Sequence, residues 1–596
     1  MRDASISGEQ SVGWMRSWAL VGQFARQHLS AYVLAASVIA VAEIFQAQIP
    51  QVIGEFTNAL KHGDSITMLS VDVWKLVGFA VLYVGIFGVG QFFIGRLGRI
   101  FEADLRQQLY THWQTLSAQF FQERSVGDLL SHAINDVPAV RESLSGTTIQ
   151  VVQSVFLISA TLYMTLRHVN SRLTLVSLSP LLLIPVIVAV MSPLVRQRAQ
   201  RVKESLSDMS AFAEESLGAV RLIKATANEP TMIKRFTQRV DVIVDRTMAA
   251  VQTNTLLQAI LPFVSNISFV VALVYGGWLV MTHVISLGAF VAFTLYLRLL
   301  VNPLTQLGQV TNTLQTASAS LIRIQNLLDT QPTVRNAPDA VRHVDGHTIS
   351  IRHLSFRYPD RTVDALIDMS IEIPAGYLVG LVGRTGAGKT TLLRLLIREF
   401  DPPPGTIWIN GHDVRQIALH TLRGELVSYI SQSTFLFSTT IGQNIGFPLV
   451  DPNPRVVEAA AKRAQLWELV QQLTHRFDTM IGERGVRLSG GQRQRTALAR
   501  ALAQTRARIL ILDDAMSAVD TETESAIVAM LEELRGDRTI LIASHRIAAV
   551  QTADLILVFD HGQIIEVGTH ESLLRKQGFY ARLAQIQSPC EEDFLL

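Results

Sequence analysis

One stretch decides the fold of the C-terminal half of this 596-residue chain: Leu378-Val379-Gly380-Leu381-Val382-Gly383-Arg384-Thr385-Gly386-Ala387-Gly388-Lys389-Thr390-Thr391. Residues 378–382 predict a short apolar strand, and residues 392–400 have the pattern of a helix. Glycines let the loop between them curl so that its N–H groups face phosphate oxygens, and the helix N-terminus adds positive potential. The complete G-x-x-x-x-G-K-[ST] pattern therefore predicts a nucleotide-phosphate site, with Lys389 at the β- and γ-phosphates and Thr390 at Mg²⁺.

Two further strands predict polar side chains at the same sheet edge. Residues 509–512 form a buried strand that delivers Asp513 and Asp514 at its carboxyl end, where open α/β sheets place ligands. Asp513 suits a water-mediated contact with Mg²⁺. The strand at 539–543 presents His545 at this edge. Short β-rich runs alternate with helical patterns here, which predicts an α/β domain.

The N-terminal half carries six apolar runs, each long enough to cross a hydrocarbon core of about 30 Å. They cover residues 29–53, 71–95, 144–166, 173–195, 255–281 and 287–310. We therefore predict an all-α six-helix transmembrane domain fused to the α/β P-loop domain.

The connections between these runs alternate in length and charge. Residues 96–143 and 196–254 are long, helical in pattern and rich in arginine, whereas the other connections are short. The positive-inside rule places the long loops and both termini in the cytosol. We expect the helices to continue tens of ångströms beyond the bilayer.

These patterns predict four parts of the chain. Residues 1–28 form an interfacial helix, 29–329 the transmembrane domain, 330–346 a polar linker and 347–596 the nucleotide-binding domain.

Composition agrees with a membrane protein, since 48% of the residues are hydrophobic and only 17% are charged, against about 25% in soluble domains. Lys+Arg number 52 and Asp+Glu 50, which argues against nucleic-acid binding driven by bulk charge. The single cysteine, Cys590, excludes an internal disulfide framework and fits a reducing compartment.

The pentapeptide Leu488-Ser489-Gly490-Gly491-Gln492 lies between the phosphate loop and the Asp-tipped strand. Alone it is a glycine-containing helix start able to hold an anion. In this position it resembles the signature of the ATP-binding-cassette family, and the resemblance covers essentially the whole chain. It implies that two cassettes meet head to tail, so that Ser489 and Gly491 of one subunit cap the γ-phosphate held by the other.

The resemblance implies roles for further residues. Tyr358 is similar to the aromatic that stacks on adenine, and Gln432 to the glutamine that touches Mg²⁺ and the attacking water. Asp520 ends a segment similar to the loop through which cassettes communicate, and His545 resembles the switch histidine at the γ-phosphate.

Three other segments resemble parts of bacterial exporters with six spans and one cassette. Residues 482–485 look like the exporter-specific segment that contacts the cytosolic loops. Residues 120–136 and 214–224 resemble the coupling-helix regions of those loops.

One residue departs from the family pattern. The family normally has glutamate after the Walker B aspartate, and this chain has Asp514. Its carboxylate reaches roughly 1.5 Å less far, and about 1 Å of misplacement can cost 10²-fold in rate. We expect this site to bind ATP well but to hydrolyse it poorly; a loop-capping role for Asp514 is compatible with the same loss.

The intact signature beside this weakened site resembles the degenerate-site subunit of bacterial heterodimeric multidrug exporters. The expected partner is a second half-transporter with the catalytic glutamate; a slow homodimer is the alternative. The resemblance places the chain in the bacterial cytoplasmic membrane.

Polar residues inside spans mark candidate substrate contacts, because such groups are costly in lipid and often functional. Glu43, Arg298 and Asn302 are the main candidates, and the other polar candidates in the spans are Gln46, Gln48, Gln91, Gln306 and Gln309. Alternatively, the amides bond neighbouring helices, and Arg298 pairs with Glu43.

The hypothesis is ATP-driven export of small amphipathic compounds (drugs, lipids or peptides) by alternating access, in contact with membrane lipid. A siderophore importer of the same architecture and an ATP-gated channel or regulatory subunit remain alternatives. The spans exclude a soluble cassette protein acting on nucleic acid.

Overall fold

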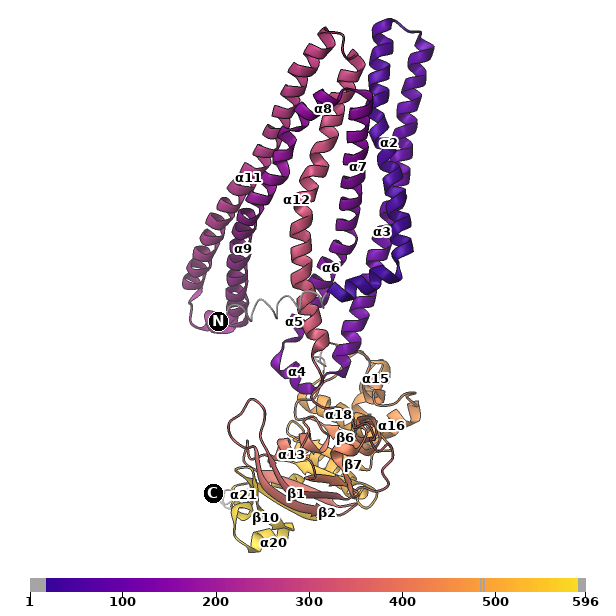
Figure 1. Ribbon diagram of the computed structural model, residues 1–596. Coiled ribbons are helices and arrows are strands. Elements are labelled where there is room, and N and C mark those ends of the chain that lie inside the picture. The colour runs from indigo at the N-terminus through magenta and orange to yellow at the C-terminus, as the bar shows by residue number, and fades with distance from the viewer. Residues whose placement is uncertain (1–17, 483–484, 486–487, 588–596) are drawn as a thin grey trace, which may run out of the picture. The chain divides into compact units, whose positions relative to one another are not determined.

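The computed structural model describes residues 18–482, 485 and 488–587, and the chain divides into two units (Figure 1). One unit comprises residues up to 114 together with 126–330; the other comprises 115–125 together with residues from 331 on. Residues 18–27 of the predicted interfacial helix are helical. Residues 1–17, Cys590, and Glu483 and Arg484 of the exporter-like segment lie outside the described residues.

Within the described residues, six helical runs are long and apolar enough to cross a membrane, which confirms the predicted fold class of the first unit. The α-helices of these runs are α2 (Leu29–His62), α3 (Ile66–Thr115), α5 (Val126–Ser131), α6 (Val137–Leu144), α7 (Gly146–His168), α8 (Ser171–Leu178), α9 (Leu183–Gly218), α11 (Glu229–Met281) and α12 (Leu287–Asp329). The short helix α10 (Val220–Ala225) lies between the fourth and the fifth run.

These helices extend well past the apolar runs, as predicted. The 53 residues of α11 span about 80 Å at 1.5 Å per residue, far more than the hydrocarbon core. The predicted fourth span is not one uninterrupted helix, because Pro180 begins a 3₁₀ turn between α8 and α9. Proline lacks the N–H that an uninterrupted helix requires.

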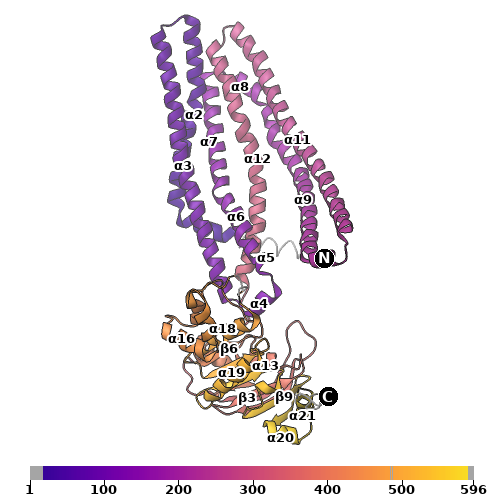
Figure 2. The same ribbon diagram turned by 180° about the vertical axis from the view of Figure 1, so that it is seen from behind.

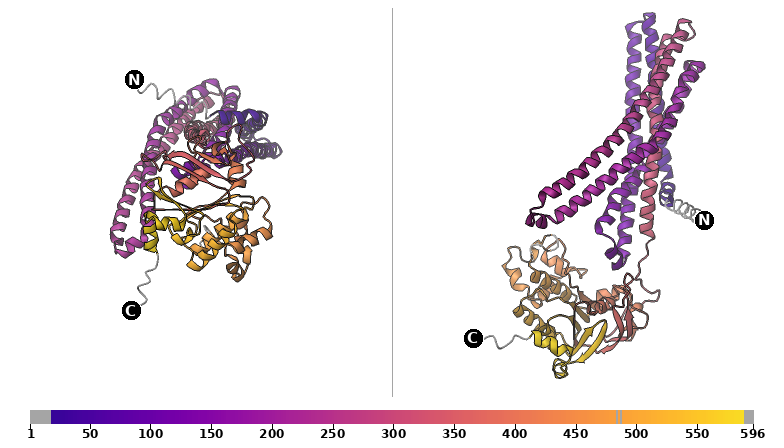
Figure 3. Two further views of the ribbon diagram at one scale, coloured as in Figure 1. Left: turned by 90° about the horizontal axis from the view of Figure 1, so that it is seen from below. Right: turned by 90° about the vertical axis from the view of Figure 1, so that its left-hand side faces the viewer.

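Helix α12 runs through the middle of this unit, with α2, α3 and α7 on one side and α9 with α11 on the other (Figure 2). Its first turn packs closely on α2, where a Cβ on Gly54 would lie 2.6 Å from Gly288 O. Small residues allow such close approach in membranes. Helices α9 and α11 stay together and diverge from the others toward α10 (Figure 3).

The second unit contains two sheets. The larger has the order β10-β9-β3-β8-β7-β6, with β10 antiparallel to β9 and the other neighbours parallel. Its strands are β3 (Leu378–Gly383), β6 (Val427–Ile430), β7 (Ile509–Asp513), β8 (Thr539–Ala543), β9 (Leu555–Asp560) and β10 (Gln563–Gly568). The smaller, of order β2-β1-β4-β5, comprises β1 (Ile349–Phe356), β2 (Leu366–Ile373), β4 (Ile407–Ile409) and β5 (His412–Asp413).

Helices complete this α/β unit and confirm its predicted class. They are α4 (Ala118–Glu123), α13 (Lys389–Leu396), α14 (Leu419–Thr421), α15 (Ile441–Gly446), α16 (Pro454–Arg463), α17 (Trp467–Gln472), α18 (Gly490–Ala503), α19 (Thr521–Glu533), α20 (His570–Arg575) and α21 (Phe579–Gln587). Strands β1 and β2 face the viewer in Figure 1, and α19 in Figure 2.

Alternate residues of the central strands enter two different cores. Leu378 and Val382 of β3 belong to the core shared with α18 and α19, whereas Val379 and Leu381 face the core shared with the smaller sheet. Successive side chains of a strand point to opposite faces, so both faces of the sheet are covered and β3, β7 and β8 are buried along their whole length.

The polar segment predicted as a linker packs on this unit. Val341 N donates to Gln416 O at 2.7 Å. Arg398, only 1% exposed, donates from Nη2 to Arg335 O at 2.9 Å, from Nη1 to Ile417 O at 3.1 Å and from Nε to Asp401 Oδ1 at 2.9 Å. One buried guanidinium therefore joins the segment to the end of α13.

Replacing Arg398 with Met should lower the free energy of unfolding of this unit by about 3 kcal/mol, because a half-buried carboxylate and two carbonyls lose their donor. Urea titration of the detergent-solubilised full chain, followed by tryptophan fluorescence, measures the change. The matched control is Arg361→Met, whose side chain is 74% exposed. Equal effects of the two changes would contradict the role of Arg398.

Candidate nucleotide-binding site

The carboxyl ends of β3, β6, β7 and β8 meet at one edge, since β3, β8, β7 and β6 are neighbouring parallel strands. A cavity of about 230 Å³ lies there. The residues that line it are Tyr358, Thr385, Gly386, Ala387, Gly388, Lys389, Thr390, Thr391, Arg394, Gln432, Asp513, Asp514, Ala543, Ser544 and His545. The structure thus brings together most residues predicted to bind or hydrolyse ATP.

The phosphate loop has a conformation that only glycine adopts easily. Gly386 and Gly388 have φ of +83° and +106°, and a Cβ on Gly388 would lie 2.7 Å from Leu366 Cδ2. Lys389 Nζ donates to Gly383 O at 2.7 Å and to Arg384 O at 3.1 Å. Burial lowers the pKa of Lys389, and the nearby Asp513 and Asp514 oppose this shift. The loop thus directs its backbone and one cation into the cavity.

Two of the three residues predicted to contact Mg²⁺, Thr390 and Asp513, are in contact with each other. Thr390 Oγ1 donates to Asp513 Oδ1 at 2.9 Å, and Tyr429 Oη donates to Asp513 Oδ2 at 3.4 Å. Burial raises the pKa of Asp513, and these hydrogen bonds oppose the shift. A hydroxyl and a carboxylate are the hard oxygen ligands that Mg²⁺ prefers, together with phosphate oxygens and water. The residues present therefore fit this cation.

Tyr358 is held rigidly at the rim of the cavity. Its Oη donates to Thr391 Oγ1 at 3.1 Å. Its ring packs edge-on against Phe356 and Phe400, with centroid separations of 5.2 and 5.1 Å. An aromatic ring fixed in this way is suited to stacking on a base.

The backbone of Asp514 is anchored on the neighbouring strand. Its N–H donates to Ala543 O of β8 at 2.9 Å. Its φ of +50° is unusual for a residue with a Cβ. Strained backbone of this kind is common at functional sites. The backbone position of Asp514 is therefore set by β7 and β8.

The signature residues are absent from the cavity of their own chain. Ser489 caps α18, where its Oγ accepts from Gln492 N at 3.3 Å. None of residues 488–492 lines the cavity, and neither does Asp520, which caps α19 by accepting from Thr523 N at 2.9 Å. The hydrogen bond from the Thr523 N–H is the main reason why the pKa of Asp520 is lowered.

Within one chain the signature is tied to the loop that ends at Asp520. A Cβ on Gly491 would lie 2.7 Å from Ala518 O. Buried Gln494 donates from Nε2 to Ser517 Oγ at 3.0 Å and accepts from Ala518 N at 2.9 Å. Sequence reasoning missed Gln494, whose only signal was a polar residue on the buried face of a helix.

A second missed contact joins α4, in the first predicted coupling region, to the cavity wall. Gln122 Nε2 donates to Glu399 Oε1 at 3.3 Å. Glu399 Oε2 lies 3.7 Å from Nε of Arg394, which lines the cavity. No short motif encodes this contact, because its residues lie far apart in the sequence.

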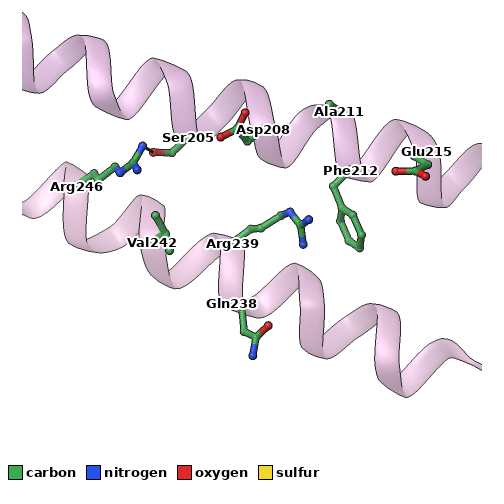
Figure 4. Close-up of a pocket in the computed structure, with 9 residues that line it drawn as sticks. All are labelled: Ser205, Asp208, Ala211, Phe212, Glu215, Gln238, Arg239, Val242 and Arg246. Atoms are coloured by element: carbon green, nitrogen blue, oxygen red, sulfur yellow. Dashed lines mark hydrogen bonds between the residues drawn. The ribbon is translucent and has the colours of Figure 1, made fainter.

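The other coupling region, residues 214–224, covers the end of α9 and most of α10. A cavity of about 640 Å³ opens between α9 and α11 (Figure 4). Arg239 lies over the ring of Phe212, 4.0 Å from its centroid. Arg246 Nη1 donates to Ser205 Oγ at 2.7 Å. These contacts hold the two helices together.

The structure does not gather the three predicted substrate residues. Glu43 is fully buried, and the side chain of Gln153 interacts with its carboxylate. Arg298 is exposed and lies over Phe269, 5.6 Å from the ring centroid. Asn302 is also exposed. Glu43 and Arg298 therefore form no ion pair among the described residues.

Known proteins resemble the chain over nearly its whole length. Residues 32–304 match the family described as "ABC transporter transmembrane region", and residues 366–517 match "ABC transporter". The chain is 31% identical to the "Probable multidrug resistance ABC transporter ATP-binding/permease protein YheI" of Bacillus subtilis (strain 168), over 94% of this chain and 96% of that protein.

A second relative and a solved structure are also similar to the chain over nearly its whole length. The chain is 31% identical to the "ATP-dependent lipid A-core flippase" of Chromohalobacter salexigens, over 96% of this chain and 98% of that protein. A solved structure described as "a bacterial Atm1-family ABC exporter with ATP bound" has a TM-score of 0.78 at 25% identity. The match covers 95% of this chain and 99% of that chain.

Six membrane helices fused to one phosphate-loop domain define an ATP-driven membrane transporter subunit. The chain belongs to the ABC transporter family and is a half-transporter of the exporter type. It is therefore a multi-pass membrane protein whose cytosolic domain binds ATP and couples its hydrolysis to transport.

Asp513→Asn should weaken ATP binding to the purified full chain at least about tenfold with Mg²⁺ present, because a charged ligand of the cation is lost. With EDTA the affinity should stay within about twofold. Titration with a fluorescent ATP analogue measures both values. Asp360→Asn, at an exposed carboxylate, is the control, and an equal loss with EDTA would contradict the assignment to Mg²⁺.

Proposed function

We propose that the chain is one subunit of a heterodimeric exporter of amphipathic compounds in the bacterial cytoplasmic membrane. The names of two relatives, a multidrug transporter and a lipid A-core flippase, support this class of cargo. The heterodimer is inferred from Asp514, which stands where the family normally has the catalytic glutamate. The signature of the same chain lies outside the chain's own ATP cavity.

Several roles at the chain's own site follow from the cavity. Lys389 and the loop N–H groups bind the β- and γ-phosphates, and Tyr358 stacks on adenine. Thr390, Asp513 and Gln432 hold Mg²⁺, which neutralises phosphate charge when bound. His545, at the end of β8, bonds the γ-phosphate.

The remaining predicted residues act on a second chain. Ser489, Gly490, Gly491 and Gln492 lie outside their own cavity, so the γ-phosphate that they cap is held by a partner. Asp520 ends the loop of residues 517–520, and Gln494 ties that loop to the signature through Ser517 and Ala518. Completion of each ATP site therefore requires two cassettes.

The weakness of the chain's own site follows from the anchoring of Asp514. A glutamate would carry its carboxylate one methylene further toward the attacking water. Because the Asp514 N–H is bonded to Ala543 O, the backbone cannot advance to restore this reach. Misplacement by about 1 Å reduces rates on the order of 10²-fold, so the proposed partner supplies the catalytic glutamate and performs most of the hydrolysis.

Asp514→Glu should raise the ATPase rate of the chain purified alone at least about tenfold. Phosphate release in detergent or nanodiscs measures this rate. Asp514→Asn should stay at or below the rate of the unmodified chain, and Lys389→Ala should abolish the gain. Vigorous turnover by the unmodified chain, on the order of 10 s⁻¹, with no gain from glutamate, would contradict the asymmetric site.

Transport is tested with the chain and its genomic neighbour co-purified into inside-out vesicles. ATP-dependent uphill accumulation of a fluorescent amphipathic dye or lipid inside the vesicles is expected of an exporter. Movement only down a gradient would indicate a channel, and uphill movement in the opposite direction would indicate an importer.

A further inference from the structure

A second cavity in the membrane unit has a lining that suits one class of ligand. It lies between α9 and α12 and measures about 790 Å³. The polar part of its lining comprises a guanidinium, four carboxamides and two hydroxyls, on Arg196, Gln197, Gln200, Asn312, Gln315, Ser192 and Thr311. The lining residues include no carboxylate and no aromatic ring among those that the structure describes.

One hydrogen bond joins the polar groups that face this cavity from α9 and α12. Arg196 Nη1 donates to Gln315 Oε1. This bond uses the acceptor of Gln315 and leaves its two amide hydrogens, together with the other N–H groups of Arg196, as donors. The carboxylate next to the cavity, on Glu204, is not part of the lining and accepts from Gln200 Nε2 at 3.3 Å. Unused donors and one positive charge favour an anionic ligand.

The cavity also has an apolar wall. Pro185, Ala189 and Pro193 line it and recur every four residues along α9, so they share one helix face. From Pro185 to Gln200 the helix rises about 22 Å. One end of the cavity is therefore apolar and the other carries the guanidinium.

We propose that this cavity binds an amphipath with an anionic head group, such as a phosphate, sulfonate or carboxylate. Arg196 and Gln315 bind the head group, and the apolar chain lies along the wall from Pro185 to Pro193. A cationic amphipath finds no carboxylate or aromatic ring in this lining. The inference rests on the proposed export function and names the class of its cargo.

Binding of two fluorescent lysolipids with the same acyl chain tests the proposal on the full transporter in detergent. We expect lysophosphatidic acid to bind at least about tenfold more tightly than zwitterionic lysophosphatidylcholine, as charge-assisted hydrogen bonds imply. Arg196→Gln should remove this preference. Lys203→Gln, which removes a positive charge from an exposed position of α9 outside the cavity, should preserve it. Retained ATP binding verifies that each variant is folded.

Three outcomes would overturn the proposal: equal affinity for the two lysolipids, equal loss of preference in the Arg196 and Lys203 variants, or displacement of the lysolipid by millimolar inorganic phosphate. The last result would indicate a site for free anions. Vesicle transport of the dye separates the two proposals. If the dye is transported but lysophosphatidic acid is not preferred, only the anionic head-group site is contradicted. If lysophosphatidic acid is preferred but ATP drives no transport, only the export function is contradicted.

Discussion

The parallel pairing of β3, β8, β7 and β6 is the constraint on which the ATP site depends. It brings the phosphate loop, Asp513, Gln432 and His545 to one edge of the sheet. The same pairing continues one residue further, where the Asp514 N–H bonds to Ala543 O. The scaffold that assembles the site thus also fixes the residue that, in our proposal, weakens it. Two buried cores, one on each face, hold this edge in place.

The helices of the membrane unit associate for different reasons than the strands of the ATP-binding unit. Lipid offers no hydrophobic drive for helix association, and small residues allow close approach; α2 and α12 meet through glycines. In the part of α9 and α11 that is predicted to lie in the cytosol, arginine contacts hold the two helices together. The cavity beside α12 is polar at one end and apolar at the other. Closure of two cassettes on ATP supplies the force for transport in our proposal, and this cavity gives the cargo a place to bind.

Much of the fold and of the ATP site could be predicted from the sequence, because each depends on local patterns. Apolar runs of about 20 residues predict spans, and the loop ending at Lys389 carries its own strand and helix. The missed features depend on tertiary contacts: Arg398 bonds carbonyls of two distant segments, and Gln122 contacts Glu399. Glu43 was predicted as a substrate residue from its polarity inside a span; the structure shows that it is fully buried, and its role in binding substrate stays a prediction.

The central claim is that a second polypeptide completes each ATP site. A photo-reactive residue in place of Ser489, in the full chain co-expressed with its genomic neighbour, tests it directly in membranes. We expect an ATP-dependent adduct of two polypeptides, in which the residue at position 489 of one is attached to the phosphate loop of the other. Attachment to the phosphate loop of the same polypeptide, in a band of single-chain mass, would contradict it.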